Sequence, residues 1–257
     1  SAPHMVTFKN LGRFFTRHGA GKHQLDVTEL RTAFLSSRSA AERAEEFRLG
    51  RLGRLIGGDS PVLLSSDKLL VVHAIPEGSL FGTLSVDLHK AKSEYSDFKP
   101  IAVSGWGTRF NLDGLIATAG YYREDQTQTG YMQLHHNGVI ETVYSDIYFD
   151  ASGSGFTPGI GSQDVFNAIV DFTDRVQRIY RKLDIVPPVS ILISFTGMRG
   201  VVLHVSRRGS TSAFDRDTLL LPDVRIEPYE ESSREMLRPA MDRLWQAAGH
   251  ERCFLYC

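Results

Sequence analysis

A β-hairpin centred on Asn137-Gly138 is the sequence feature that most restricts the fold of this chain. Strand-forming residues flank the dipeptide on both sides, from Tyr131 to Tyr144. Asn and Gly tolerate the positive φ angles of a tight primed turn, so the two flanks are predicted to pair as antiparallel strands. A purely parallel sheet is therefore disfavoured, and the surrounding segments decide among the remaining fold classes.

Apolar runs predict further strands. Residues 69–75 are almost continuously apolar and end at Pro76, which is typical of a strand buried on both faces. Residues 189–195 have the same character, and residues 201–205 are predicted to be their neighbour. Other strands are expected at residues 11–16, within residues 101–122 and at residues 219–226.

Capping residues and helical periodicity predict four longer helices. Asp26 is expected to cap a helix that ends near residue 35, and Ser39 with Glu42 forms a capping box for a second helix that ends at Gly57-Gly58. In this second helix, Leu49, Leu52 and Ile56 are predicted to line one side, and Arg43, Arg51 and Arg54 another. The remaining helices are predicted over residues 163–183, capped by Ser162, and over residues 233–248, ended by Gly249.

Strands and helices alternate along the chain without a long linker or an internal repeat. This order predicts an α+β (mixed α/β) fold, in which a mixed sheet containing an antiparallel hairpin packs against several helices. The chain has 257 residues, 42% of them hydrophobic and 23% charged, which is ordinary for a soluble globular protein. No apolar run approaches the ~20 residues that span a bilayer, so we expect a cytoplasmic protein without membrane contact.

Basic residues are concentrated near the N-terminus. Residues 9–54 contain ten Lys and Arg against five Asp and Glu, a net charge of +5, whereas the rest of the chain has 19 against 25, a net charge of −6. A basic arm beside an acidic body is compatible with contact to a polyanion. A solvated helical face would have the same composition.

The residues predicted to bind nucleic acid lie within this arm and surround Gly19 and Gly21. They are Arg13, Arg17, His18, Lys22 and His23. Glycine lets a backbone approach a phosphate closely, and arginine can hold it with two hydrogen bonds. Phe14 and Phe15 alternate in direction along a strand, so one of them is available to stack on a base unless both belong to a core.

No motif predicts a catalytic residue, a metal ion or a cofactor. The glycines between residues 153 and 161 lack the G-x-G-x-x-G spacing of a dinucleotide site, and a connecting loop is expected there. His135 and His136 are predicted to face opposite sides of a strand, and His73 and His204 to be core histidines. The C-terminal residues His250, Cys253 and Cys257 supply three potential metal ligands without an evident fourth, so free thiols are expected.

A cluster of carboxylates is the basis of the alternative hypothesis, a metal-dependent nuclease or another hydrolase. Its candidate residues are Asp113, Glu124, Asp125, Glu141, Asp146 and Asp150. A third hypothesis is an oligomerisation or protein-interaction module.

The N-terminal segment, an aromatic strand followed by the turn 17–23 and a capped helix, resembles the closing part of the AlbA-like domain of Schlafen-type proteins. Softer similarity to the C-terminal regions of bacterial proteins with such a domain covers most of the chain. The similar segments are residues 51–61, 70–76, 110–114, 133–141 and 237–249.

The resemblance implies a bacterial, cytoplasmic, multidomain parent protein, and it suggests a role in regulation or antiphage defence. It implies that residues 6–60 are the end of an AlbA-like domain with a helical connector, and that residues 61–257 are a C-terminal α/β domain. Residues 1–5 are interpreted as a cloning scar. In this family the acidic residues linked to nuclease activity lie upstream of the matching piece, so the leading hypothesis is a non-catalytic binding or sensing domain that contacts nucleic acid.

Overall fold

The structure is a computed structural model in which the chain divides into two units, residues 1–49 and residues 50–257. This division falls inside a helix, earlier than the boundary at residue 60 that the resemblance implies. The described residues are 6–7, 14–18, 21–24, 26–93, 96–119, 125–149, 158–205, 212–229 and 231–256.

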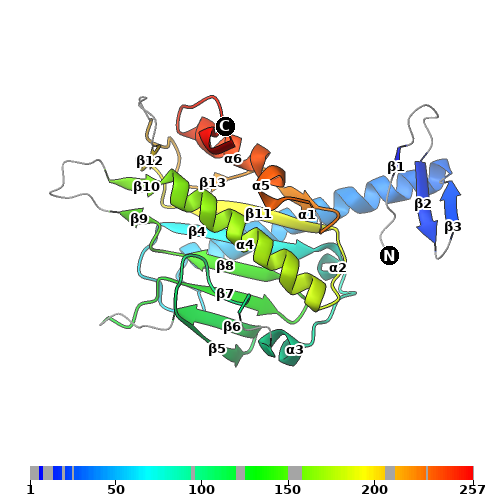
Figure 1. Cartoon of the computed structure of the whole chain (residues 1–257), viewed down its shortest axis with the longest axis horizontal. Helices are drawn as coiled ribbons and strands as arrows, with labels where there is room; N and C mark the ends of the chain where they lie inside the picture. The colour runs from blue at the N-terminus through cyan, green and yellow to red at the C-terminus, as the bar shows by residue number, and fades with distance from the viewer. Residues whose placement is uncertain are drawn as a thin grey trace. The chain divides into compact units, whose positions relative to one another are not determined.

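The first unit contains a small antiparallel sheet and most of the helix that follows it (Figure 1). Its strands are β1 (Val6–Thr7), β2 (Phe14–His18) and β3 (Gly21–Gln24), in the order β1-β2-β3. The basic segment is therefore a hairpin in which β2 and β3 pair directly, and not a strand followed by an extended turn. The prediction of a strand at residues 11–16 is confirmed at residues 14–16, and residues 11–13 lie outside the described residues.

One continuous helix, α1 (Val27–Ile56), replaces the two helices predicted between residues 26 and 56. The capping box at Ser39 was wrong, because Ser39 lies inside this helix. The intervening residues 36–38 include neither glycine nor proline, and serine and arginine are tolerated in a helix, so nothing interrupts the backbone ladder there. Residues 50–56 of α1 belong to the second unit.

The second unit is built on a large sheet in which every described pairing is antiparallel. The strands follow the order β13-β11-β4-β8-β7-β6-β5, and β14 also pairs with β11. Their bounds are β4 (Leu69–Pro76), β5 (Trp106–Asn111), β6 (Gly114–Ala119), β7 (Gly130–His135), β8 (Ile140–Tyr144), β11 (Val189–Thr196), β13 (Leu219–Leu220) and β14 (Val224–Ile226). The single strand predicted at residues 219–226 is two short strands, separated by a segment that includes Pro222.

A second, smaller sheet contains a parallel pair. It consists of β9 (Tyr148–Phe149), β10 (Gly159–Gly161) and β12 (Val202–His204), and β12 runs parallel to β10. The strand predicted at residues 201–205 therefore exists, but its neighbour is β10 and not β11. The combination of antiparallel and parallel strands with packed helices confirms the predicted α+β fold.

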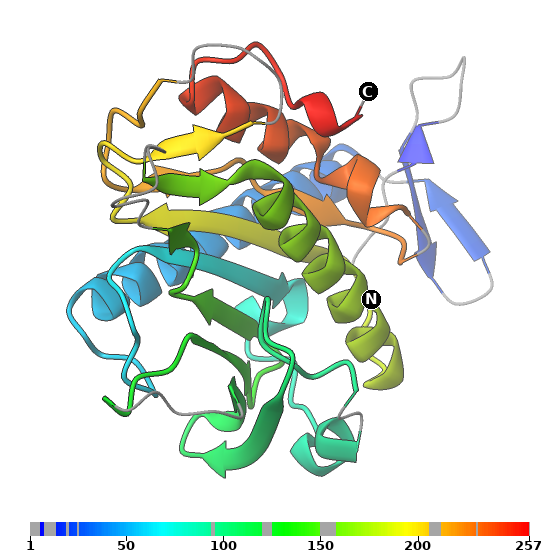
Figure 2. The same ribbon diagram turned by 60° about the vertical axis from the view of Figure 1, so that its left-hand side comes forward.

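Helices cover one face of the large sheet (Figures 1 and 2). They are α4 (Ser162–Lys182), α5 (Ser233–Met236) and α6 (Arg238–Ala247). The other described helical segments of this unit, apart from the end of α1, are α2 (Glu77–Leu80), α3 (Leu88–Ser93) and a 3₁₀ turn (Phe254–Tyr256). The helix predicted over 233–248 is broken at Leu237, ahead of Pro239, and Gly249 ends α6 with a φ of +86°. Ser162 begins α4 and does not cap it, since the N-cap position is Gly161. None of the described helices combines the length and apolar character needed to cross a bilayer.

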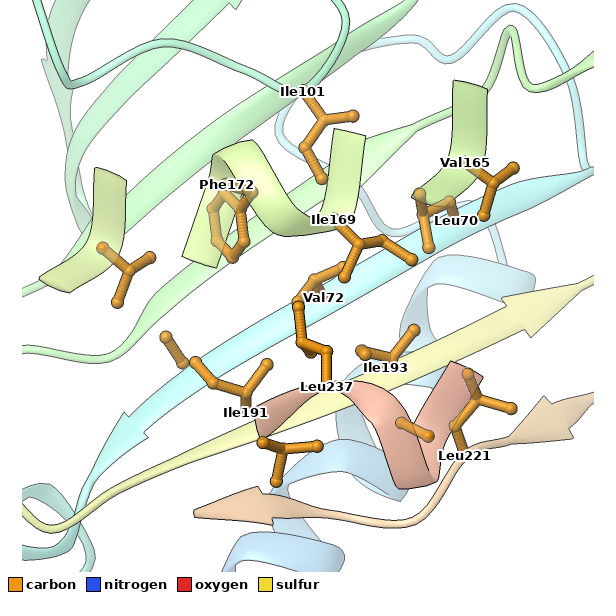
Figure 3. Packing of buried hydrophobic residues seen from close by; sticks show 14 of the residues in the cluster. Leu70, Val72, Ile101, Val165, Ile169, Phe172, Ile191, Ile193, Leu221 and Leu237 are labelled. Carbon is orange, nitrogen blue, oxygen red and sulfur yellow. The ribbon is translucent and has the colours of Figure 1, made fainter. Parts of the chain in front are cut away.

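The main core lies between these helices and the sheet (Figure 3). Leu70 and Val72 of β4 pack there with Ile169 and Phe172 of α4. The alternate β4 residues Leu69 and Val71 face the other side of the sheet, because successive side chains of a strand point to opposite faces. All eight residues of β4 are buried, which confirms the prediction of a strand buried on both faces.

The last two turns of α1 cover that other side. Leu52 and Leu55 are buried against Leu69 and Val71, together with Ile116, Tyr131 and Val143 from neighbouring strands. Leu49 and Ile56, which were predicted to line the apolar side of the helix, are 51% and 61% exposed. The predicted apolar side is therefore correct at Leu52 and wrong at Leu49 and Ile56, and Arg51, predicted on another side, also faces the sheet.

The hairpin at Asn137-Gly138 is confirmed, although its turn differs from the predicted one. Only Gly138 of the pair has a positive φ, +87°, and its N–H donates to the carbonyl of His135 at 2.9 Å. The N–H of His135 in turn donates to the carbonyl of Val139 at 2.8 Å. The loop is thus of the three-residue type, in which glycine follows a type I turn, and not a two-residue primed turn.

Candidate functional site

Four polar side chains meet in the layer between α1 and the large sheet, and we call them the Glu141 cluster: Arg51, His73, Tyr131 and Glu141. The sheet register brings three of them together. Glu141 of β8 lies directly opposite His73 of β4 on one side and Gln133 of β7 on the other, and Tyr131 is two positions from Gln133 in β7. Residues paired across antiparallel strands, and those two positions away, share a face. Arg51 reaches them from the last turns of α1.

The carboxylate of Glu141 accepts hydrogen bonds from all three partners. Arg51 donates in bidentate fashion, from Nε to Oε2 and from Nη2 to Oε1, each over 2.8 Å. Tyr131 donates its hydroxyl to Oε1 at 2.6 Å, and Nε2 of His73 lies 2.8 Å from Oε2. Each carboxylate oxygen therefore has two partners, which is the dense coordination that a buried charge requires.

The protonation of this cluster is determined by opposing effects. Burial alone would raise the pKa of Glu141, but the hydrogen bonds from Arg51 and His73 and the positive charge of Arg51 lower that pKa well below its ordinary value. Burial and the negative charge of Glu141 raise the pKa of Tyr131. Glu141 is therefore a carboxylate and Tyr131 a neutral phenol at neutral pH, so Nε2 of His73 acts as a donor to Glu141.

The cluster is closed to solvent. The side chains of Glu141 and His73 are fully buried, and that of Arg51 is 16% exposed. The carboxylate of Glu141 is inaccessible to solvent, and both its oxygens accept hydrogen bonds. It is therefore suited to holding the end of α1 against the strands β4, β7 and β8. His73, predicted to be a core histidine, is confirmed as one, and its role is to carry one of the contacts of Glu141.

A polar extension of the cluster runs toward the turn between β5 and β6. Asn111 and Gln133 exchange side-chain hydrogen bonds of 2.8 and 3.2 Å, and the carbonyl oxygen of the Asn111 side chain also accepts from the N–H groups of Asp113 and Gly114. His135 ends β7 close by, and burial lowers its pKa. The predicted alternation of His135 and His136 in one strand was incorrect, since His136 lies in the hairpin loop and is exposed.

The predicted nucleic-acid-binding residues lie in the β2–β3 hairpin, apart from Arg13, which is outside the described residues. Arg17 pairs directly with Lys22, Thr16 with His23 and His18 with Gly21. The backbone register thus pairs two of the three Lys and Arg residues of the predicted set, a relationship that spacing around the glycines did not predict.

The carboxylates of the hydrolase hypothesis are dispersed. Glu141 is internal, while Asp113, Asp125 and Asp146 are exposed on three different connections, and Glu124 and Asp150 lie outside the described residues. Within the described part of the chain no three His, Cys, Asp or Glu residues are arranged to hold a metal ion. Cys253 is buried, and Cys257, like most of the glycine-rich loop, is outside the described residues.

Neither a protein-family model, nor a curated protein, nor a solved structure was found to match this chain. The functional argument therefore depends on the residues themselves. The sequence did indicate that Glu141 is internal. Side chains two positions apart in a strand share a face, and Glu141 lies two positions from the apolar Val143. The partner Arg51, 90 residues away, has no comparable signal.

Proposed function

We propose that this chain is a non-catalytic binding domain that contacts nucleic acid through the face of the β2–β3 hairpin that carries Arg17 and Lys22. The observation that supports the proposal most is their direct pairing in the hairpin register. Adjacent cations are the usual means of binding neighbouring phosphates, and each such contact releases counterions from the nucleic acid.

Charge distribution supports the same assignment. Residues 6–25 contain four Lys and Arg and no Asp or Glu. Residues 1–49 have eight basic and five acidic residues, and residues 50–257 have 21 and 25, so the two units carry +3 and −4. A polyanion is therefore attracted to the N-terminal unit and repelled by the other.

The second unit serves, in this proposal, as the regulatory or positioning part of a bacterial, cytoplasmic AlbA-like protein of the Schlafen type. The support is the sequence resemblance, together with the closed Glu141 cluster. That cluster directs its strongest polar groups into the fold, where they stabilise the attachment of residues 50–56 of α1.

An electrophoretic mobility shift with single-stranded and duplex DNA and RNA tests the proposal. We expect the Arg17→Ala/Lys22→Ala variant to bind more weakly than the wild type. The matched control is Arg109→Ala/Arg252→Ala, which removes the same charge from two exposed positions of the second unit. An equal loss of affinity in both variants, or no mobility shift with the wild type, would contradict a binding site on the hairpin.

The two alternatives have separate tests. A hydrolase would cleave RNA or DNA with Mg²⁺ or Mn²⁺ above a metal-free control and lose that activity on Asp113→Asn. An oligomerisation module would give a concentration-dependent mass by light scattering.

A further inference from the structure

A second candidate binding site lies in the large unit, at the end of β8 and the start of α4. An open cavity of about 360 Å³ is present there, a volume within the range of small-ligand sites. It is independent of the hairpin and of the Glu141 cluster, none of whose residues line it.

Aromatic residues contribute to the lining of this cavity. Tyr144 comes from the end of β8, and Tyr148 and Phe149 form β9. Phe149 is 40% exposed, so its ring is accessible to a ligand. The face of an aromatic ring attracts cations, so a ring that lines this cavity can contribute to the binding of a cation.

One of these rings already has a cation above it. The ammonium group of Lys68 lies 4.9 Å from the centroid of Tyr148, within the distance of a cation–π contact. Lys68 is not among the lining residues, and its contact shows that the ring of Tyr148 can accept a cation.

Carboxylates complete the lining. Asp146 lies between the aromatic residues in the chain, and Asp164 lies in the first turn of α4, where the helix dipole favours a negative charge. Within the described part of the chain, the carboxylate of Asp164 forms no hydrogen bond or ion pair. The cavity thus has a negatively charged group that a cationic ligand can pair with.

The floor is apolar. Leu70 of β4 and Val165 of α4 both line the cavity, and Figure 3 shows them close to each other at the edge of the main core. A ligand with a charged centre and attached methyl or methylene groups matches rings, carboxylates and an apolar floor together. An inorganic cation would leave the rings and the floor without a suitable partner.

We propose that this cavity binds a substituted ammonium group, such as a quaternary ammonium or the methylated ammonium of a lysine side chain. Calorimetric titration of the whole chain with choline tests the proposal, with 3,3-dimethylbutan-1-ol as the neutral probe of the same shape. We expect saturable binding of choline and none of the neutral alcohol. A peptide with trimethyllysine, compared with its unmodified form, distinguishes a protein ligand from a small molecule.

Variants locate the site. Tyr148→Leu and Phe149→Ala are each expected to weaken choline binding by about two- to thirtyfold, the range of a cation–π contact. Phe110→Ala, at a phenylalanine that is 41% exposed on β5, is the matched aromatic control. Asp164→Asn should also weaken binding, and Asp223→Asn, at an exposed aspartate elsewhere, should not.

Thermal melts of each variant show whether it is folded, and only variants with an unchanged melting temperature are compared. The proposal is overturned if neither choline nor the trimethyllysine peptide binds the wild type. It is also overturned if the neutral alcohol binds as well as choline, or if the matched controls weaken binding as much as the cavity variants.

Discussion

Arg51 and Glu141 are joined by two hydrogen bonds of 2.8 Å although they lie 90 residues apart in the chain. This bidentate contact connects α1 to the centre of the large sheet, in the layer that also holds Leu52 and Leu55. Because Glu141 is fully buried, the loss of its partner would leave an uncompensated charge inside the fold. The contact is therefore a sensitive point for stability.

The lowered pKa of Glu141 makes its contribution to stability dependent on pH. An unfolded glutamate titrates near pH 4.3, whereas the folded protein keeps Glu141 charged to lower pH. The stabilisation is complete above the unfolded pKa and is lost as the pH falls through the folded one. We expect Glu141→Gln to lower the free energy of unfolding by about 3–5 kcal/mol at pH 7.

Urea unfolding between pH 7 and pH 2 measures this effect. The difference between wild type and Glu141→Gln should decrease below about pH 4, where the wild type begins to lose its advantage. Glu251→Gln, at an exposed position, serves as the control and should follow the wild type. A difference that is constant across this pH range would contradict the assigned ionisation of Glu141.

Replacing both members of the ion pair tests whether they act together. Arg51→Met and Glu141→Leu should each destabilise the fold, because each leaves a buried polar partner behind. The double variant should lose clearly less free energy of unfolding than the two single variants together, since buried ion pairs are often replaced by apolar residues at little cost in stability. Additive losses in denaturant unfolding would mean that the two side chains contribute separately.

Gly130 in β7 offers a test of the strand packing. A Cβ atom at this position would lie 2.3 Å from the carbonyl oxygen of Val143 in the neighbouring β8, and a backbone oxygen cannot move aside easily. Gly130→Ala is expected to cost about 1–3 kcal/mol or more. Gly107→Ala in β5 is the control, because a Cβ there meets nothing within 4 Å. Equal melting temperatures for the two variants would contradict the close approach of β7 and β8 at Gly130.

Sequence reasoning succeeded where local pattern determines structure. The apolar run of β4 and the Asn137-Gly138 hairpin follow from alternation, burial and turn chemistry, which act within a few residues. The amphipathic pattern of α4 was similarly informative, to within one residue at each end.

The errors arose where contacts between distant parts of the chain determine the structure. A capping box at Ser39 is locally plausible, yet the backbone of α1 continues through it. Arg51 would lie on a solvated face of an isolated helix, and only the position of Glu141 in the sheet draws it inward. The pairing of β12 with β10, in place of β11, is likewise a property of the tertiary fold.

The most direct test of the proposed function is the salt dependence of nucleic-acid binding, measured by fluorescence anisotropy with a labelled single strand. The logarithm of the binding constant should fall linearly with the logarithm of salt concentration, with a slope of roughly −0.7 for each phosphate contacted. Arg17→Ala/Lys22→Ala should make this slope shallower by about 1.4, corresponding to two lost contacts, while Arg109→Ala/Arg252→Ala leaves it unchanged. Absence of salt-dependent binding by the wild type, or the same slope in the hairpin variant, would contradict the account.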